Sequence, residues 1–131
     1  MKRKVIAPAS VFKAKPFAFS QGILVKEGKK TLFISGQLAA DRKGKLIPGD
    51  FKEQCRRSYR AMDAVLKEAG TTKESIVKIT AYVIDMRNEL DDFVSETKKY
   101  FGSEYPASTL VQVGALALEG QLVEIEAIAI I

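Results

Sequence analysis

The segment DFKEQCRRSYRAMDAVLKEAGTTKESIVKITAYVI, residues 50–84, contains a change of hydrophobic period that decides the fold class. Asp50, followed three residues later by Glu53, resembles a helix capping box. From there to residue 69, residues suited to a helix core recur every three or four positions, which predicts an amphipathic helix: Phe51, Cys55, Tyr59, Met62, Leu66 and Ala69. Residues 76–84, IVKITAYVI, are rich in β-branched residues and predict a strand.

The chain on both sides of this segment continues the alternation of strands and helices. Residues 17–26 (FAFSQGILVK) and 31–39 (TLFISGQLA) predict two strands, with a plausible turn at residues 27–30. Beyond the central segment, the pattern predicts a second helix and two final strands: residues 90–101, 108–116 and 122–131. The expected order is β-β-α-β-α-β-β. No repeat or long linker divides the chain, so we expect one α+β domain over residues 1–131.

The composition excludes several kinds of catalytic site. Its 131 residues are 47% hydrophobic, which is enough for a real core in one domain. The chain has no histidine and one cysteine, which excludes the usual zinc sites and the serine–histidine and cysteine–histidine nucleophile pairs. No glycine-rich phosphate loop is present. We therefore expect no metal and no organic cofactor, and we expect Cys55, within the apolar stripe of its helix, to pack in the core.

Cellular location and partners are predicted from charge and hydropathy. The apolar runs are far shorter than the roughly 20 residues that span a bilayer. A lone cysteine and the lack of a signal-peptide pattern favour the cytoplasm. The net charge is +5, but all 21 basic residues lie at or before Lys99 and are scattered along the sequence without an RNA-binding motif. A solvated basic surface is therefore the simpler interpretation, and we expect neither membrane nor nucleic-acid binding.

Three segments, taken in order, resemble the Rid (RidA/YjgF-like) family, also known under the names endoribonuclease L-PSP and translation inhibitor. Ile34-Ser35-Gly36-Gln37 looks like its strand-borne SGQ motif. The segment YPAST at residues 105–109 resembles its Pro-Ala-Arg-Ser/Thr stretch, and LVEIEAIA at residues 122–129 resembles its terminal VEIEAIA strand. The resemblance covers about residues 15–131.

This resemblance implies a chorismate-mutase-like α+β fold, with a mainly antiparallel sheet and two helices on one face. It also implies a homotrimer with a central barrel and small-molecule clefts between subunits. The best-known members hydrolyse enamines and imines such as 2-aminoacrylate to a 2-oxo acid and ammonia. In them an arginine clamps the substrate carboxylate, and a glutamate near the C-terminus positions water. By position, that glutamate is Glu124, whose side chain shares a strand face with Glu126. The alternation of residues alone fits a solvated strand face as well as it fits a working carboxylate.

The chain departs from the family pattern at the expected cleft. Ser108 stands where active members have the arginine, Leu110 where cysteine is frequent, and Phe19 where tyrosine is common. An extra residue falls within residues 115–121. The chain thus resembles an arginine-less subfamily, and the sequence leaves open whether an earlier cation such as Arg87 takes over the role. The resemblance places six residues at the cleft, with Ser108 and Thr109 either donating hydroxyls there or capping a strand: Phe19, Ser35, Gly36, Ser108, Thr109 and Glu124.

Three functional hypotheses follow. The first is a metal-free, deaminase-type hydrolase of an enamine, imine or related metabolite, with Glu124 as the catalytic carboxylate. The second is a non-catalytic protein whose pocket senses or sequesters a metabolite. The third is an RNA-directed endoribonuclease or translation inhibitor, which ranks last because the chain has no histidine and no obvious acid–base pair for RNA cleavage. The sequence does not name the ligand.

Overall fold

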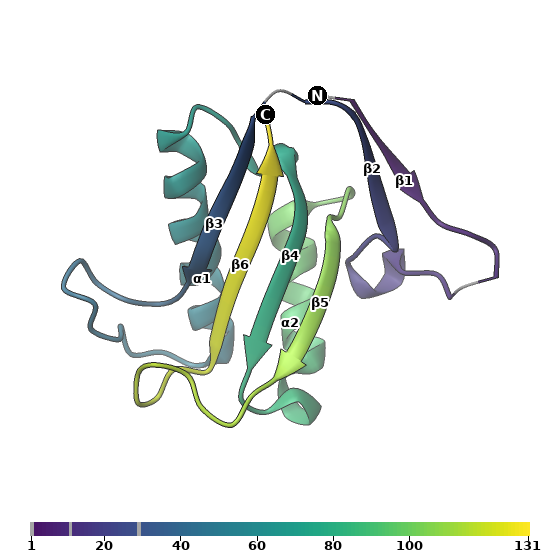
Figure 1. The fold of residues 1–131 in the computed structure, drawn as a ribbon. Coiled ribbons are helices and arrows are strands. Elements are labelled where there is room, and N and C mark those ends of the chain that lie inside the picture. The colour runs from purple at the N-terminus through teal and green to yellow at the C-terminus, as the bar shows by residue number, and fades with distance from the viewer. Residues whose placement is uncertain (1, 11, 29) are drawn as a thin grey trace.

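The computed structural model describes residues 2–10, 12–28 and 30–131 (Figure 1). It contains two α-helices, α1 (Phe51–Glu68) and α2 (Met86–Phe101), and two short 3-10 turns, η1 (Lys15–Phe17) and η2 (Lys73–Ser75). The described strands are β1 (Lys2–Ile6), β2 (Gly22–Glu27), β3 (Thr31–Gln37), β4 (Ile76–Val83), β5 (Ala107–Gln112) and β6 (Val123–Ile130).

A four-stranded sheet with the order β3-β6-β4-β5 forms the centre of the molecule. Its β3–β6 and β4–β6 pairs are antiparallel, and its β4–β5 pair is parallel. Both helices cover one face of this sheet and leave the other open (Figure 1). Along β6, Val123, Ile125 and Ala127 are buried while the residues between them are half-buried, so odd positions face the helices. The α+β class with two helices on one face is confirmed.

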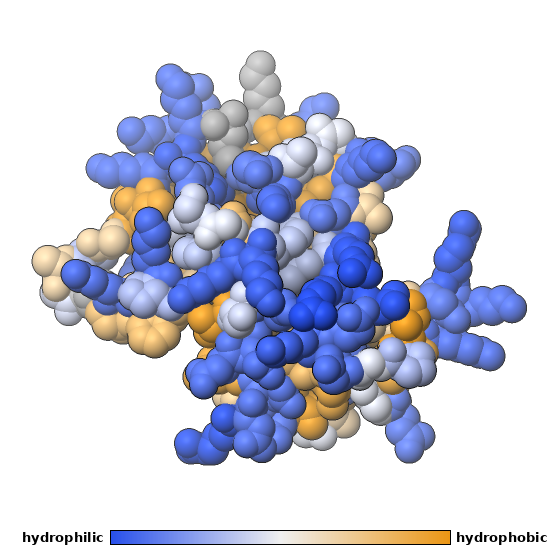
Figure 2. Space-filling model, turned by 180° about the vertical axis from the view of Figure 1, so that it is seen from behind, coloured by the Kyte–Doolittle hydropathy of each residue, from blue (hydrophilic) through white to orange (hydrophobic). Residues whose placement is uncertain are grey.

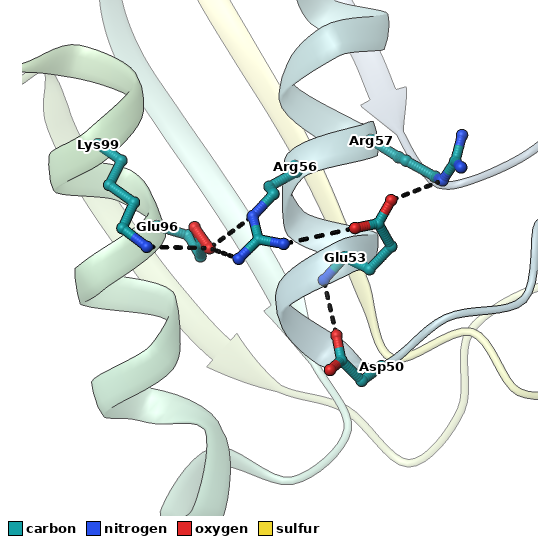
Figure 3. Close-up of polar contacts among 6 residues, drawn as sticks. All are labelled: Asp50, Glu53, Arg56, Arg57, Glu96 and Lys99. Carbon is teal, nitrogen blue, oxygen red and sulfur yellow. Dashed lines mark hydrogen bonds and ion pairs between the residues drawn. The ribbon is translucent and has the colours of Figure 1, made fainter.

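The helices are held by a cap that was expected from the sequence and by an ion pair that was not. The Asp50 side chain accepts a hydrogen bond from the Glu53 amide at 2.9 Å and caps α1. Between the helices, Arg56 Nη2 lies 2.7 Å from Glu96 Oε1, although the Glu96 side chain is almost fully buried (Figure 3). Cys55 is buried as expected, and burial raises the pKa of its thiol. The surface seen from the helix side is mostly hydrophilic (Figure 2).

Several element boundaries differ from the sequence-based expectation. Residues 2–6 form β1, a strand that the analysis missed because it is short and basic. The strand expected from residue 17 begins only at Gly22, because Pro16 favours a 3-10 turn and Ala18 has a left-handed φ of 63°. Helix α2 starts at Met86, four residues earlier than expected, since its first turn is largely polar and carries no apolar period.

The first two expected strands do not form the hairpin that the turn at residues 27–30 suggested. Among the described strands, β2 pairs with β1 instead, and β3 pairs with β6. The β1–β2 hairpin lies at the far side of the molecule, beyond β5 (Figure 1). Lys29, within the expected turn, falls outside the described residues. The expected pairing of these two strands was wrong because local turn chemistry competes with the tertiary docking of residues 12–21, described below. The trimer and its barrel stay predictions.

Candidate functional site

Glu124 lies on the open face of the sheet, against the SGQ segment. Its neighbours Val123 and Ile125 point into the core, so the half-buried Glu124 side chain points the opposite way. The β3–β6 register shifts between Ile34 and Gln37, which is a bulge at Ser35 and Gly36. A Cβ atom on Gly36 would lie only 2.7 Å from Glu124 Cγ. Glycine is therefore needed here to leave room for the carboxylate.

A second side chain orients this carboxylate. The buried Gln121 donates from Nε2 to Glu124 Oε1 at 3.3 Å and to the Val123 carbonyl at 3.2 Å. Its own Oε1 accepts a hydrogen bond from the Leu118 amide at 3.2 Å. Gln121 was not among the expected site residues; its polar side chain just before the apolar start of β6 was the signal that the sequence offered. We call Ser35, Gly36 and Glu124 the carboxylate half-site.

Ser108 faces the helices, on the other side of the sheet. It pairs with Ile79 of the parallel β4, and Ile79 is fully buried against the helices. There Ser108 lines a cavity of about 510 Å³ between α2, β5 and the segment before β2. The cavity is lined by one hydroxyl-bearing residue and eight apolar ones: Ser108, Phe12, Phe17, Ala18, Phe19, Leu90, Phe93, Val94 and Leu110. We call Phe19, Ser108 and Leu110, with this cavity, the apolar half-site.

The segment of residues 12–21 brings Phe19 to the apolar half-site by docking on the start of β5. The Ser20 amide donates to the Pro106 carbonyl at 2.8 Å, and the buried Ser20 hydroxyl donates to the Tyr105 carbonyl. Ser20 also forms an isolated parallel bridge with Ala107. The rings of Phe12 and Phe19 meet edge to face with their centroids 5.8 Å apart. Residues distant in sequence thus share one apolar wall.

Thr109 points to the open face, away from Ser108. Its hydroxyl accepts a hydrogen bond from Lys78 Nζ at 2.6 Å, and burial lowers the pKa of that lysine. Nearby, the Tyr82 hydroxyl donates to the Glu126 carboxylate, which raises the tyrosine pKa. Lys78 was not among the expected site residues; its place inside a strand gave no sign that its ammonium group would be fixed beside Thr109.

No cation from the described part of the chain lines the apolar half-site. Arg87, the cation considered as a replacement for the family arginine, is exposed in the first turn of α2 and is not among the residues that line the cavity. Lys78 lies on the opposite face of the sheet from Ser108. The Ser108 hydroxyl is therefore the main polar group of this wall.

Within one chain the two half-sites are separate. Ser108 faces the helices from the edge strand β5, whereas Glu124 faces away from them on β6. Glu124 is not among the residues that line the cavity beside Ser108. The structure brings Gly36 and Glu124 together, with Ser35 next to Gly36 in the β3 bulge, and separately it brings Phe19 and Ser108 to one cavity. A cleft containing all of them requires a second copy of the chain.

Comparisons with known proteins agree with the fold and the motifs. The family model described as Endoribonuclease L-PSP matches residues 13–131. The chain is 37% identical over 129 residues to a bovine 2-iminobutanoate/2-iminopropanoate deaminase, covering 98% of this chain and 90% of the bovine one. It is 36% identical over 113 residues to the human protein of the same name, covering 86% and 79% of the two chains.

Solved structures give the same assignment. The Rid-family protein YyfB of Yersinia pestis, described as of unknown function, superposes with a TM-score of 0.91 at 32% identity over the whole of both chains. RidA from an Antarctic Psychrobacter superposes with a TM-score of 0.72, also at 32% identity, over 95% of this chain and 94% of its own. At equal identity, this chain is thus markedly closer in shape to YyfB.

Proposed function

Because this chain belongs to the Rid family, we propose that it binds a small imine or enamine in a cleft between neighbouring copies and hydrolyses it to a carbonyl compound and ammonia. The relatives named as iminobutanoate and iminopropanoate deaminases support this reaction type. The observation that carries the proposal is the position of Glu124, held against Gly36 and hydrogen-bonded by Gln121 at 3.3 Å.

The reaction needs one water molecule and one group that positions it. Glu124 accepts a hydrogen bond from water and takes its proton as the oxygen attacks the imine carbon. The C–O bond forms while the C=N electron pair moves to nitrogen, and Glu124 returns the proton to that nitrogen, giving a neutral carbinolamine. Glu124 then moves the proton of the carbinolamine hydroxyl to the same nitrogen, the C–N bond breaks, and ammonia leaves as the carbonyl forms. Every atom comes from the imine and water, so the balance requires no metal or organic cofactor.

The two half-sites support an assembly in which each cleft is shared. The carboxylate half-site lies near the β3 edge of the sheet and the apolar half-site at the β5 edge. A neighbouring copy that places its β5 edge beside this chain's β3 edge would complete one cleft from both. Repeating this head-to-tail contact around a closed ring of three copies pairs every β5 edge with a β3 edge. Each half-site then belongs to a complete cleft.

The lining of the apolar half-site indicates the substrate. An arginine would hold a substrate carboxylate through two charge-assisted hydrogen bonds, and Ser108 offers one neutral hydroxyl. The surrounding phenylalanine and leucine side chains instead favour an apolar substituent. We therefore expect an imine or enamine with an apolar group in place of a small 2-imino acid. The same lining is what favours the second candidate, a non-catalytic protein that binds an apolar metabolite.

Two measurements on the wild-type protein test the proposal. A thermal-shift screen of stable carbonyl and imine analogues should raise the apparent Tm, because a ligand that binds the native state stabilises it. Ammonia release from a panel of imines with apolar and carboxylate substituents should then exceed the spontaneous rate, most clearly for the apolar ones. A thermal shift without ammonia release from any panel member would favour the binding protein over the enzyme.

A further inference from the structure

We propose that the β1–β2 hairpin of one copy pairs through β2 with the β3 edge of a neighbouring copy, so that strand exchange holds the assembly together. The occupant of the β3 edge is thus a second copy of this chain. This inference adds a structural basis for the shared cleft of the proposed function. The strand exchange itself does not rest on that function; only its consequence for the cleft does.

The chain carries two open strand edges that match in kind and length. Among the described strands, β3 pairs with β6 alone and β2 with β1 alone. β2 has six residues and β3 has seven. The side chain of Phe33 on β3 is 75% exposed, and that of Leu24 on β2 is 51% exposed. An exposed, apolar edge strand is a template for pairing with another chain.

The docking of residues 12–21 prevents β2 from reaching β3 of its own chain. Ala107, where Ser20 is bound, is separated from Phe33 by three strand spacings, through Lys78 and Ile128. Ser20 lies one spacing beyond Ala107, and a strand paired with β3 would lie one spacing beyond Phe33, so the two are five spacings apart, roughly 24 Å at about 4.8 Å each. With a turn at residues 28–30, Val25 would face Phe33. Val25 comes only five residues after Ser20, a reach of at most about 18 Å.

The alternative is that the hairpin undocks and folds back on its own β3. That would break the two hydrogen bonds of Ser20, both to carbonyls beside β5. It would also break the bond from Arg3 Nη1 to the Ile76 carbonyl, at 2.8 Å. A neighbouring copy satisfies the β2 and β3 edges without losing any of these contacts. Exchange therefore costs less than folding back.

Exchange would also place the two half-sites together. The hairpin is tied to the apolar half-site of its own chain, because Ser20 is bonded beside β5 and the adjacent Phe19 lines the cavity. When this hairpin pairs with β3 of the next copy, it approaches the strand that carries Ser35 and Gly36. The connection between β2 and β3, residues 28–30, is then the link between neighbouring copies.

Cysteine cross-linking tests the exchange in the full chain. When chains exchange an identical element, the pairing between chains is the one that the element would make within its own chain. Within one chain, β2 and β3 would be joined by a turn at residues 28–30, and Val25 would face Phe33. We therefore place the cysteines at these two positions. Tagged Val25→Cys and untagged Phe33→Cys are co-expressed, and the Val25→Cys/Phe33→Cys double variant is made separately. The native Cys55 is buried and does not interfere. Free-thiol counts after maleimide labelling check that the new cysteines are accessible.

Exchange predicts a two-chain band, lost on reduction, when the single variants are co-expressed and oxidised. It predicts a ladder of linked chains for the double variant. A disulfide confined to single chains of the double variant would overturn the proposal, as would accessible thiols that form no disulfide in either sample. Linked chains without ammonia release or ligand-induced thermal shift would leave the exchange standing and contradict the proposed function. Ammonia release together with disulfides confined to single chains would support the proposed function and contradict the exchange.

Discussion

The two half-sites lie on the same sheet, but they offer opposite chemistry. The carboxylate half-site is polar: a glycine makes room for Glu124, and a buried glutamine holds its carboxylate. The apolar half-site is a cavity of about 510 Å³ whose main polar group is the hydroxyl of Ser108. One wall is suited to activating water and the other to holding an apolar group. Under the proposed function, this difference leads us to expect that substitutions in the carboxylate half-site change the rate of hydrolysis, whereas substitutions in the apolar half-site change the choice of substrate.

The largest effect is expected from removing the catalytic charge. Glu124→Gln keeps the shape of the carboxylate half-site but cannot take a proton from water, so kcat for ammonia release should fall by about 10²- to 10⁴-fold. The matched control is Glu126→Gln, two residues along the same strand face, whose carboxylate binds the Tyr82 hydroxyl instead. Equal losses in both variants would show that the open face acts as a whole, with no special role for Glu124.

The next effect compares substrates on the unmodified protein. Hydrolysis of 2-aminoacrylate should be slower than in arginine-containing family members by roughly 30-fold to several thousand-fold, the cost of about 2–5 kcal/mol for losing an oriented charged contact. A pyridoxal-phosphate dehydratase generates the imine, and 2-oxo acid formation is followed. Ser108→Arg should recover only part of the rate, because Phe19 and Leu110 also differ from the family pattern. A wild-type rate equal to that of an arginine-containing member would contradict this prediction.

A smaller loss of activity is expected when the Glu124 carboxylate is displaced instead of removed. The Cβ atom of Gly36→Ala would meet the Glu124 side chain, which can swing aside. A misplaced catalytic group typically costs about 10- to 100-fold in rate, and the folded state should lose little stability because the contact involves a flexible side chain. We expect kcat to fall while Tm changes by a few degrees at most. A collapse of Tm would show that Gly36 serves the fold and not the site.

The smallest effect should come from the apolar wall. Phe19→Ala removes part of the cavity lining, and burial of an apolar side chain contributes about 1.5–3 kcal/mol. Because a ligand covers only part of the ring, we expect KM for an apolar imine to rise about tenfold with kcat nearly unchanged. Phe12→Ala, which removes another ring of the same wall, is the matched comparison. A fall in kcat with KM constant would place Phe19 beside the reacting atoms.

Most of the fold could be predicted from the sequence, since periodicity is a local signal. The apolar stripe of α1, its Asp50 cap and the alternation of buried residues in β6 lie within single elements. The SGQ and VEIEAIA segments likewise identified Gly36 and Glu124, whose contact depends only on the pairing of two neighbouring strands. Gln54 of α1, by contrast, reaches the distant loop before β6 and donates to the Gly120 carbonyl at 3.0 Å.

The tertiary structure alone decided which residues face each other across the sheet and where the first hairpin lies. Ser108 and Thr109 are adjacent in sequence but point to opposite faces, so one lines the apolar cavity and the other binds Lys78. The expected turn at residues 27–30 was a local signal, and it was outweighed by the hydrogen bonds of Ser20 to β5, some 85 residues away in sequence. Local periodicity specifies an element; only the competition between distant contacts determines what that element pairs with.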